Sequence, residues 1–337
     1  MDAAPLHSPF GSTRSDSMPT DKPTQRIASL ISAATEMLFA LGLADRVVAV
    51  SHECDWPPEV ATLSRVTSSR VDSAASSLEI DEQVQKQSVA GQPLYEIDRE
   101  QLEALGPDVI VTQAQCDVCA VRYEDVVELV AASDRLSATN IVSLAPETLT
   151  DVLRDITRLG EALDVPQAAA QLVNQLETRL ADVEHRVAEV PDAQRPRVAI
   201  IEWLEPLMIA GNWTPGLVER AGGRYELAVE GRHSPYAEWS ALVEYDPQVL
   251  VLCPCGFDVE RTLSEVARVT ERREWRQLTA VKNGRVCVLD GNAYLNRSGP
   301  RLVDTVEILA HLVHPERCGV PASVTDPQQA WRPLANE

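Results

Sequence analysis

Short apolar runs rich in valine and isoleucine alternate with stretches of helical periodicity over the first half of the chain. The strand-like runs lie at residues 26–32, 47–51, 109–113 and 140–144. Apolar residues recur at helical spacing in residues 34–43, 98–106 and 121–132, with weaker helical character near residues 80–87. Strands that alternate with helices favour a parallel sheet. Residues 26–145 are therefore predicted to form one α/β lobe, preceded by a disordered extension, residues 1–25, that is too polar to bury a core.

The middle of the chain, residues 146–195, has an almost purely helical pattern. Leu172, Leu176, Leu180 and Val183 fall on one helical face. Pro166 fits best in the first turn of a helix, so a break is expected there and a second helix over residues 166–189. At the standard rise of an α-helix this segment would be about 36 Å long, enough to span two lobes.

The strand and helix alternation then returns. Strands are predicted at residues 198–203 and 248–254 and at the end of residues 279–290. Helices are predicted at residues 214–223, 240–246, 259–266 and 302–315. The chain thus divides into a second α/β lobe, residues 196–317, and a tail, residues 318–337. The predicted fold is α/β, with two Rossmann-like lobes of parallel sheet and one long helix between them.

Charge and length narrow the class of protein. The chain has 337 residues with 30 Lys and Arg against 51 Asp and Glu, a formal net charge of -21. A protein that neutralises phosphates needs a basic face, so neither nucleic acid nor an anionic membrane is expected as a partner. The first 25 residues lack a charged start followed by an apolar core and a cleavage site. A cytoplasmic location is therefore expected, or a periplasmic one if the start codon is misassigned.

Cysteines follow three of the predicted strands. Cys54 with His52 follows the second, Cys116 and Cys119 follow the third, and Cys255 lies after the strand that ends near residue 254. In open α/β sheets ligands bind outside the carboxyl ends of parallel strands, so these side chains are expected to converge on one crevice. Thiolates from Cys54, Cys116, Cys119 and Cys255 would suit zinc or an iron–sulfur cluster. The alternative is that the cysteines are small apolar groups that fill gaps beneath the loops.

Four segments carry a family resemblance. They are RIASLISAATEMLFALGLADRVVAVSHECDWPPEV, GPDVIVTQAQCDVCA, DPQVLVLCPCGFD and NGRVCVLDGNAYLNRSGPRLVDTVEILAHLVHP. Together they resemble the vitamin B12-binding branch of the iron/B12 substrate-binding proteins of ABC importers, and more closely a cytoplasmic-looking subgroup labelled cobalamin-binding protein. The resemblance implies two lobes that clamp a metal chelate, joined by one long helix with little hinge motion.

The resemblance also suggests roles for single residues. Trp56, Trp203, Trp213 and Tyr294 would stack on a large macrocycle, and Asn292 and Arg297 would meet propionamide or phosphate groups of a corrinoid. His52 would be an axial ligand of cobalt. A glutamate on each lobe docks on the permease in importer-associated members, and Glu100 and Glu219 hold the matching positions. Ordinary solvated or core positions remain the alternative for each of these residues.

Two functions follow from the sequence. The first is non-catalytic binding of cobalamin or a related corrinoid by a monomer, with an ABC permease as a partner. The second is a cytosolic metal, iron–sulfur or thiol-redox protein built on Cys54, Cys116, Cys119 and Cys255. No enzymatic activity is expected, because the sequence contains no nucleophile elbow, zinc-protease motif or phosphate loop.

Overall fold

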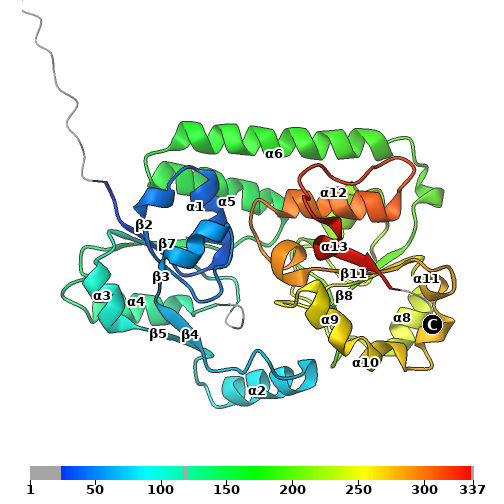
Figure 1. Ribbon diagram of the computed structural model, residues 1–337, viewed down its shortest axis with the longest axis horizontal. Coiled ribbons are helices and arrows are strands. Elements are labelled where there is room, and N and C mark those ends of the chain that lie inside the picture. Colours follow the sequence, from blue (N-terminus) through cyan, green and yellow to red (C-terminus); the bar gives the residue numbers. More distant parts are fainter. Residues whose placement is uncertain (1–23, 117, 119, 335–337) are drawn as a thin grey trace, which may run out of the picture.

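The computed structural model describes residues 24–116, 118 and 120–334. It has two α/β lobes side by side, with the long helix α6 (Pro166–Val187) lying along both of them (Figure 1). The predicted two-lobed α/β fold is confirmed. Within the described residues, no helix combines the length and the apolarity that a membrane span requires.

The N-terminal lobe is built on a five-stranded sheet in the order β3-β2-β1-β6-β7, with all neighbouring strands parallel. Its strands are β1 (Ile27–Ser29), β2 (Val47–Val50), β3 (Ser64–Arg65), β6 (Val109–Gln113) and β7 (Asn140–Leu144). Helices α1 (Ser32–Ala40), α3 (Arg99–Leu105) and α4 (Tyr123–Ala131) connect them. Every residue of β6 is buried, as expected for a central parallel strand covered on both faces.

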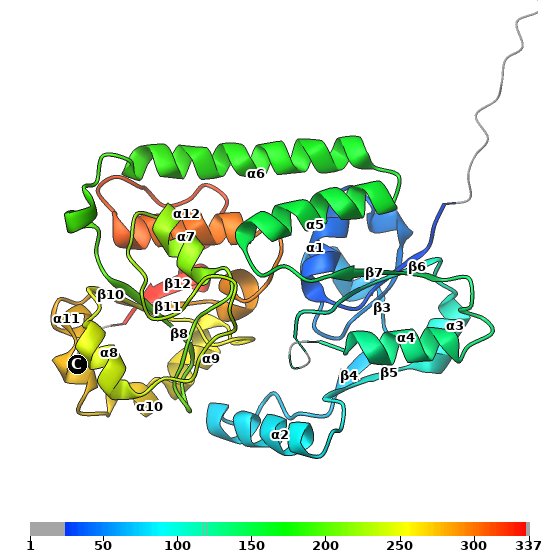
Figure 2. The ribbon, with the colours of Figure 1, turned by 180° about the vertical axis from the view of Figure 1, so that it is seen from behind.

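A long excursion leaves this lobe after β3. Strands β4 (Thr67–Ser69) and β5 (Tyr95–Ile97) form an antiparallel ribbon, and helix α2 (Ser77–Val89) lies between them. We call residues 66–98 the strap. In Figure 2 the strap carries α2 away from the N-terminal sheet, to the side of the molecule opposite α6. The sequence predicted only a weak helix in this segment, because α2 is mostly polar and the two strands have three residues each.

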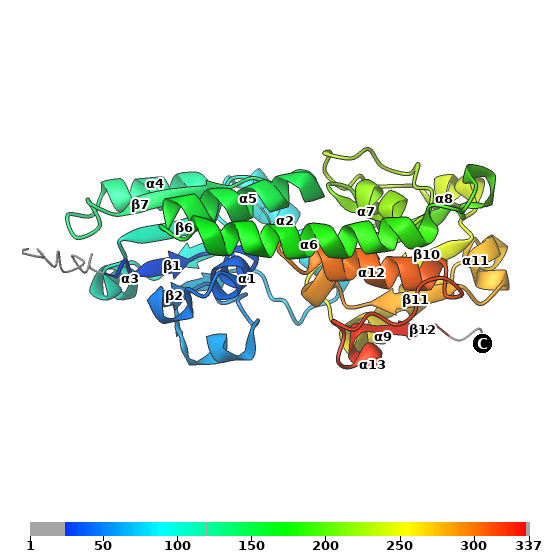
Figure 3. The same cartoon turned by 90° about the horizontal axis from the view of Figure 1, so that it is seen from above.

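The connector is a helical hairpin of α5 (Leu149–Ala162) and α6. Pro166 occupies the first turn of α6, as predicted. The two helices pack closely at Gly160, where a Cβ would lie 2.3 Å from the Cβ of Ala169. In the C-terminal lobe, Glu307 accepts a hydrogen bond from Arg179 of α6 at 2.7 Å, and Asp304 also pairs with this arginine. Helix α6 therefore packs on α5 and on the C-terminal lobe, and Figure 3 shows from above that it lies along both halves of the molecule.

The C-terminal lobe has a mixed five-stranded sheet in the order β12-β11-β10-β8-β9. The parallel strands are β8 (Val198–Trp203), β10 (Val249–Leu252) and β11 (Val286–Leu289). The edge strands β9 (Met208–Ile209) and β12 (Trp331–Pro333) are antiparallel. The segment predicted as a tail thus supplies an edge strand. With three residues, this strand is too short to show an alternation of apolar and polar positions in the sequence.

Short helices complete this lobe and the connections. The α-helices are α7 (Thr214–Arg220), α8 (Trp239–Tyr245), α9 (Val259–Glu265), α10 (Ala267–Thr270), α11 (Thr279–Lys282), α12 (Leu302–Val313) and α13 (Pro327–Ala330). Tighter 3-10 turns are η1 (Ala44–Arg46), η2 (Pro58–Thr62), η3 (Asp192–Gln194) and η4 (Trp275–Gln277), and η5 (Gly291–Leu295) is a π-turn. Helix α12 packs against both α6 and α7 and ties the sheet to the connector.

Candidate functional site

The loops that follow β2 and β11 meet directly between the two lobes. The amide of Asn292 donates to Asp55 Oδ2 at 2.7 Å, and Arg297 Nη1 donates to Asp55 Oδ1 at 2.5 Å. These loops leave the carboxyl ends of strands in opposite lobes, the edge at which α/β sheets bind ligands. The candidate site is therefore the region between the lobes where the carboxyl ends of the two sheets face each other.

A group of charged side chains holds the lobes together at this junction. Arg297, only 7% exposed, also donates to Glu36 of α1 at 3.3 Å, and Arg301 donates to both oxygens of Glu36 at 2.5 and 2.9 Å. Burial lowers the pKa of Arg297, but its contacts with Asp55 and Glu36 outweigh burial and raise it. We call Glu36, Asp55, Asn292, Arg297 and Arg301 the arginine lock.

The lock changes the interpretation of two predicted ligand contacts. Arg297 Nη2 donates to the Asn292 carbonyl oxygen at 2.8 Å, so both side chains are directed to partners within the protein. Tyr294 lies against the same group, with the Arg301 guanidinium 5.8 Å from its ring centroid. The structure therefore places these three predicted residues in a contact between the lobes.

Trp56 lies in a groove that the lock residues Glu36 and Arg301 also border. Its side chain is 46% exposed, and its ring is 5.0 Å from the Arg301 guanidinium. The groove has a volume of about 690 Å³ and reaches Val47, the first residue of β2. Because Val47 lies at the amino end of its strand, this groove extends away from the carboxyl ends where the other aromatic residues lie.

His52 lies at the base of the strap. Its Nδ1 is 2.7 Å from Thr67 Oγ1, and its Nε2 is 3.1 Å from Glu53 Oε1. The hydrogen bond from His52 is the main cause that lowers the pKa of Glu53. Both ring nitrogens therefore have partners within the N-terminal lobe.

The predicted cysteines do not form one cluster. Cys54 is fully buried in the lobe core, 3.1 Å from Thr35 Oγ1, and burial raises the pKa of its thiol. Cys119 lies outside the described residues. Cys116 and Cys255, from opposite lobes, lie close enough for the charge of Cys116 to raise the pKa of Cys255, although burial is the larger cause. Among the described residues, no group of three or more His, Cys, Asp and Glu side chains is arranged to hold a metal ion.

The two predicted tryptophans of the C-terminal lobe have different surroundings. Trp203, at the carboxyl end of β8, is half-buried, and its ring centroid is 5.3 Å from that of Phe257. Its Nε1–H donates to the Ser77 carbonyl of the strap at 3.1 Å. Trp213 is 7% exposed and donates to the Leu295 carbonyl at 2.8 Å, so it belongs to the core.

Glu202 is a site residue that the sequence analysis missed. It precedes Trp203 in β8 and accepts a hydrogen bond from Ser234 Oγ at 2.6 Å. Burial raises the pKa of Glu202 to about 7, and the nearby thiol of Cys116 also raises it. The available signal was an acidic residue at the end of the otherwise apolar run VAIIEW. Glu202 and Cys255 are adjacent, since Cys255 N–H donates to the Glu202 carbonyl at 3.0 Å, and the charge of Cys116 on the other lobe raises the pKa values of both.

The two glutamates predicted to dock on a permease lie on different lobes. Glu100 is exposed in the first turn of α3, and Glu219 is exposed in α7. Glu219 borders a surface cavity of about 500 Å³ with Glu230, whose pKa is raised by burial and by the charge of Glu219. Both carboxylates are accessible to another molecule.

Comparison with known proteins gives relatives that match most of the chain. A vitamin B12-binding protein of Vibrio cholerae is 25% identical over 85% of this chain and 87% of its own length. An uncharacterized ABC transporter substrate-binding lipoprotein, YvrC of Bacillus subtilis, is 22% identical over 88% of this chain and 82% of its own.

Solved structures share the fold. A periplasmic haem-binding protein of Pseudomonas aeruginosa matches with a TM-score of 0.66 and 21% identity, over 87% of this chain and 94% of its own. The periplasmic vitamin B12-binding protein BtuF of Vibrio cholerae matches with a TM-score of 0.62 and 23% identity, over 87% and 98%. The two proteins have one fold and different ligands, so the fold alone does not select the ligand.

These findings correct one expectation and confirm another. The expected cytoplasmic location is wrong, because the relatives are periplasmic binding proteins or a substrate-binding lipoprotein, which points to a location outside the cytoplasm. The resemblance to substrate-binding proteins of ABC importers is confirmed. The family model described as periplasmic binding protein matches residues 27–293, and the chain therefore belongs to the periplasmic binding protein family.

Proposed function

We propose that this protein binds cobalamin or a related corrinoid between its two lobes, without catalysis, and presents it to an ABC permease. The observation that carries the proposal is the neutral, partly aromatic character of the side chains between the lobes. The raised pKa values of Glu202 and Cys255 favour their neutral forms, and the half-buried Trp203, which packs on the buried Phe257, supplies aromatic surface beside them. A mainly apolar site with a few placed polar groups suits a large neutral chelate.

The arginine lock favours a corrinoid over haem. Haem carries two carboxylates, which need cationic or strongly donating partners when they leave water. The two arginines at the junction, Arg297 and Arg301, already pair with Asp55 and Glu36. The corrin ring bears neutral amides, for which a protonated Glu202 would be a hydrogen-bond donor and the Ser234 hydroxyl a second polar partner.

Of the ligand contacts predicted from the sequence, we retain Trp203, Cys116 and Cys255, with His52 at the edge. The Vibrio cholerae relatives named for vitamin B12 support this choice of ligand class. Glu100 and Glu219, exposed on separate lobes, remain our proposal for the permease contacts. Their replacement by alanine is expected to lower uptake of the ligand while leaving its binding to the isolated protein unchanged.

The test is a calorimetric titration of the purified full chain with cyanocobalamin and, separately, with haemin. We expect one cyanocobalamin per chain and a loss of affinity of about tenfold in Trp203→Ala, because the ring contributes apolar area worth at least 1.4 kcal/mol. Trp56→Ala is the matched control, because Trp56 lies in the groove that extends away from the carboxyl ends of the strands, and its affinity should stay within about twofold.

Metal analysis of the same preparation tests the thiol alternative. Absent or substoichiometric zinc and iron is expected. Stoichiometric metal that is lost in the Cys116→Ser, Cys119→Ser variant, together with no cyanocobalamin binding, would contradict the proposed function.

A further inference from the structure

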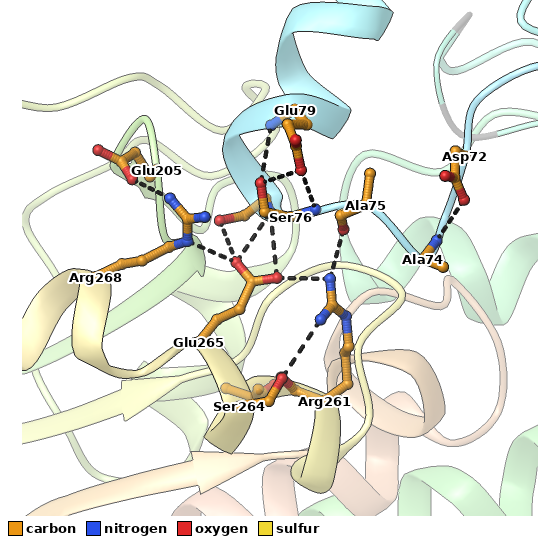
Figure 4. Close-up of polar contacts among 12 residues, drawn as sticks. Asp72, Ala74, Ala75, Ser76, Glu79, Glu205, Arg261, Ser264, Glu265 and Arg268 are labelled. Atoms are coloured by element: carbon orange, nitrogen blue, oxygen red, sulfur yellow. Dashed lines mark hydrogen bonds and ion pairs between the residues drawn. The ribbon is translucent and has the colours of Figure 1, made fainter.

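The strap crosses from the N-terminal lobe to the C-terminal lobe and is held there at its tip (Figure 4). The carboxylate of Glu265, at the end of α9, accepts hydrogen bonds from Ser77 N–H at 2.9 Å and from Ser77 O–H at 2.7 Å. Arg261 Nη2 donates to the Ala75 carbonyl at 2.5 Å. These contacts, with the bond from Trp203 Nε1 to the Ser77 carbonyl, form what we call the strap latch.

The latch is a buried and satisfied polar contact. Ser77 is fully buried, and Glu265 is 7% exposed. Glu265 is also paired within its own lobe, with Arg261 at 2.6 Å and Arg268 at 3.0 Å. When Ser77 departs, the carboxylate therefore keeps two cationic partners. The latch can open without leaving an isolated buried charge, which is the costly event for a buried ion.

After its first residue, α2 makes few contacts with the C-terminal lobe. Ser77 is its one buried residue. A second contact, from Tyr236 O–H to Asp81 at 2.9 Å, is exposed to water. The helix also carries its own N-terminal cap, in which Ser76 and Glu79 bond reciprocally. Because this cap does not involve the other lobe, it persists when the latch opens, but the short polar helix then loses its tertiary support and its own hydrogen bonds open more often.

The base of the strap is firmly attached to the N-terminal lobe. Val66 N–H donates to the Val50 carbonyl at 3.0 Å, and His52 N–H donates to Thr67 Oγ1 at 2.9 Å. Between base and tip, Gly91 follows α2 with φ at +64°. A fixed base, a helix with its own cap and one small group of contacts at the tip describe a segment that can swing as a unit.

The position of the latch gives the strap a role in access. Helix α6 joins the lobes on one side of the molecule and α2 lies on the opposite side (Figures 1 and 2). The latch residue Ser77 binds Trp203 at the carboxyl end of β8, beside Glu202 and Cys255. We propose that the strap is a gate: the contact between Ser77 and Glu265 must open before a bulky ligand enters or leaves the region between the lobes. The ligand part of this proposal rests on the proposed function.

The test uses Ser77→Pro, which removes the two donors that Ser77 supplies to Glu265 and leaves the other hydrogen bonds of the latch, to the Ser77 and Ala75 carbonyls, in place. Ser77 is the first residue of α2, where proline is accepted, and Ser76 before it already has the extended backbone that proline requires. The helix is therefore expected to survive. Glu260→Gln is the matched control, because this glutamate lies on the same helix as Glu265 but is 70% exposed and pairs with Arg332.

Two measurements need no ligand. Hydrogen exchange of residues 78–89 is expected to rise about tenfold in Ser77→Pro, with the strands of both sheets unchanged. Alkylation of Cys255 by N-ethylmaleimide, located by peptide mass spectrometry, is expected to accelerate by a smaller factor, about threefold, because this thiol is already partly exposed when the strap is closed. The control variant should match the native protein in both. If α2 exchange does not change, the latch does not hold the strap. If it rises while alkylation does not, the strap is not a gate.

The third measurement is the stopped-flow rate of cyanocobalamin binding and release. Both rates are expected to rise several-fold in Ser77→Pro, with a smaller change in Kd. Unchanged rates in a variant with a released strap would overturn the gate. If native protein does not bind cyanocobalamin at all, the proposed function fails, and the exchange and alkylation results still decide whether the strap controls access.

Discussion

The arginine lock and the strap latch are two contacts between the same lobes, built from different chemistry. In the lock, the buried charges of Glu36 and Arg297, 4% and 7% exposed, pair with each other and with the half-exposed Asp55. In the latch, a buried carboxylate meets the neutral donors of Ser77 and keeps its own arginines on the same lobe. The lock therefore cannot open without stranding charge, whereas the latch can. The difference indicates a molecule whose lobes are held permanently at one contact and reversibly at the other.

The largest expected effect comes from the lock. Arg297→Met leaves the buried Glu36 with one arginine and the half-exposed Asp55 with none, so unfolding free energy should fall by about 3 kcal/mol, the low end for a broken buried pair because water can solvate Asp55. Urea unfolding followed by circular dichroism measures this loss. Arg276→Met, at an exposed arginine, is the control and should change stability by less than about 0.5 kcal/mol. A loss below about 1 kcal/mol in Arg297→Met would mean that the lock is no stronger than a surface ion pair.

The second largest effect on stability is expected at Glu202. Its pKa is about 7 in the fold against a usual value of 4.5, so between these pH values the folded state holds a proton that the unfolded chain lacks. Stability therefore falls as pH rises from 4.5 to 7, and the cost is complete above 7. Glu202→Gln should remove most of this cost and stabilise the protein at pH 8 by roughly 2 kcal/mol, with little effect at pH 4.5.

Urea unfolding at both pH values checks this prediction. Glu226→Gln, at an exposed glutamate, serves as the control. Asp290, whose pKa is raised to about 6 mainly by burial, adds to the pH dependence of native protein and variant alike, so their difference isolates Glu202. An equal gain at pH 4.5 and pH 8 would show that the gain is unrelated to ionisation.

A smaller effect is expected at the latch. Ser77→Ala removes the hydroxyl donor and keeps the backbone donor, so global stability should fall by about 1 kcal/mol, clearly less than for Arg297→Met. Denaturant unfolding of the two variants side by side measures the ratio. If Ser77→Ala costs as much as Arg297→Met, the two contacts are equivalent and the proposed contrast between them fails.

The smallest effect is expected at the cap of α2. Ser76→Ala removes the capping box, which is worth about 1 kcal/mol to the helix itself. Because α2 packs on the C-terminal lobe only through its first turn, global stability should change by less than about 0.5 kcal/mol, while amide exchange within residues 78–89 rises. A large global loss would indicate that α2 is an integral part of the folded core.

The sequence predicted the framework of the fold and only part of the site. Strands such as β6 and β8 were readable because continuous apolar runs mark buried parallel strands, and Pro166 marked the start of α6. The strap was missed because its polar helix and short strands have no buried period. A polar helix that is buried at only one residue, here Ser77, has no periodic pattern of apolar positions in the sequence.

The sequence predicted only some of the side chains that meet between the lobes, and there are two physical reasons. Cys54 was expected to face the ligand. Instead Cys54 N–H donates to the Ser51 carbonyl at 3.1 Å in a tight turn, and its sulfur packs against Thr35 in the lobe core. Arg297 was read as a ligand contact, but its partner Asp55 is 242 positions away. A single sequence does not reveal such distant ion pairs, because they depend on the final arrangement of the lobes.

The central claim is that the ligand lies between the lobes, behind the strap. It is tested most directly by hydrogen exchange of the native full chain with and without saturating cyanocobalamin. The account predicts slower exchange in α2 and in the segments that follow β8 and β10, with the Trp56 groove, residues 36–47 and 56–63, unchanged. Slower exchange confined to that groove, with α2 and the β8 and β10 ends unaffected, would contradict it.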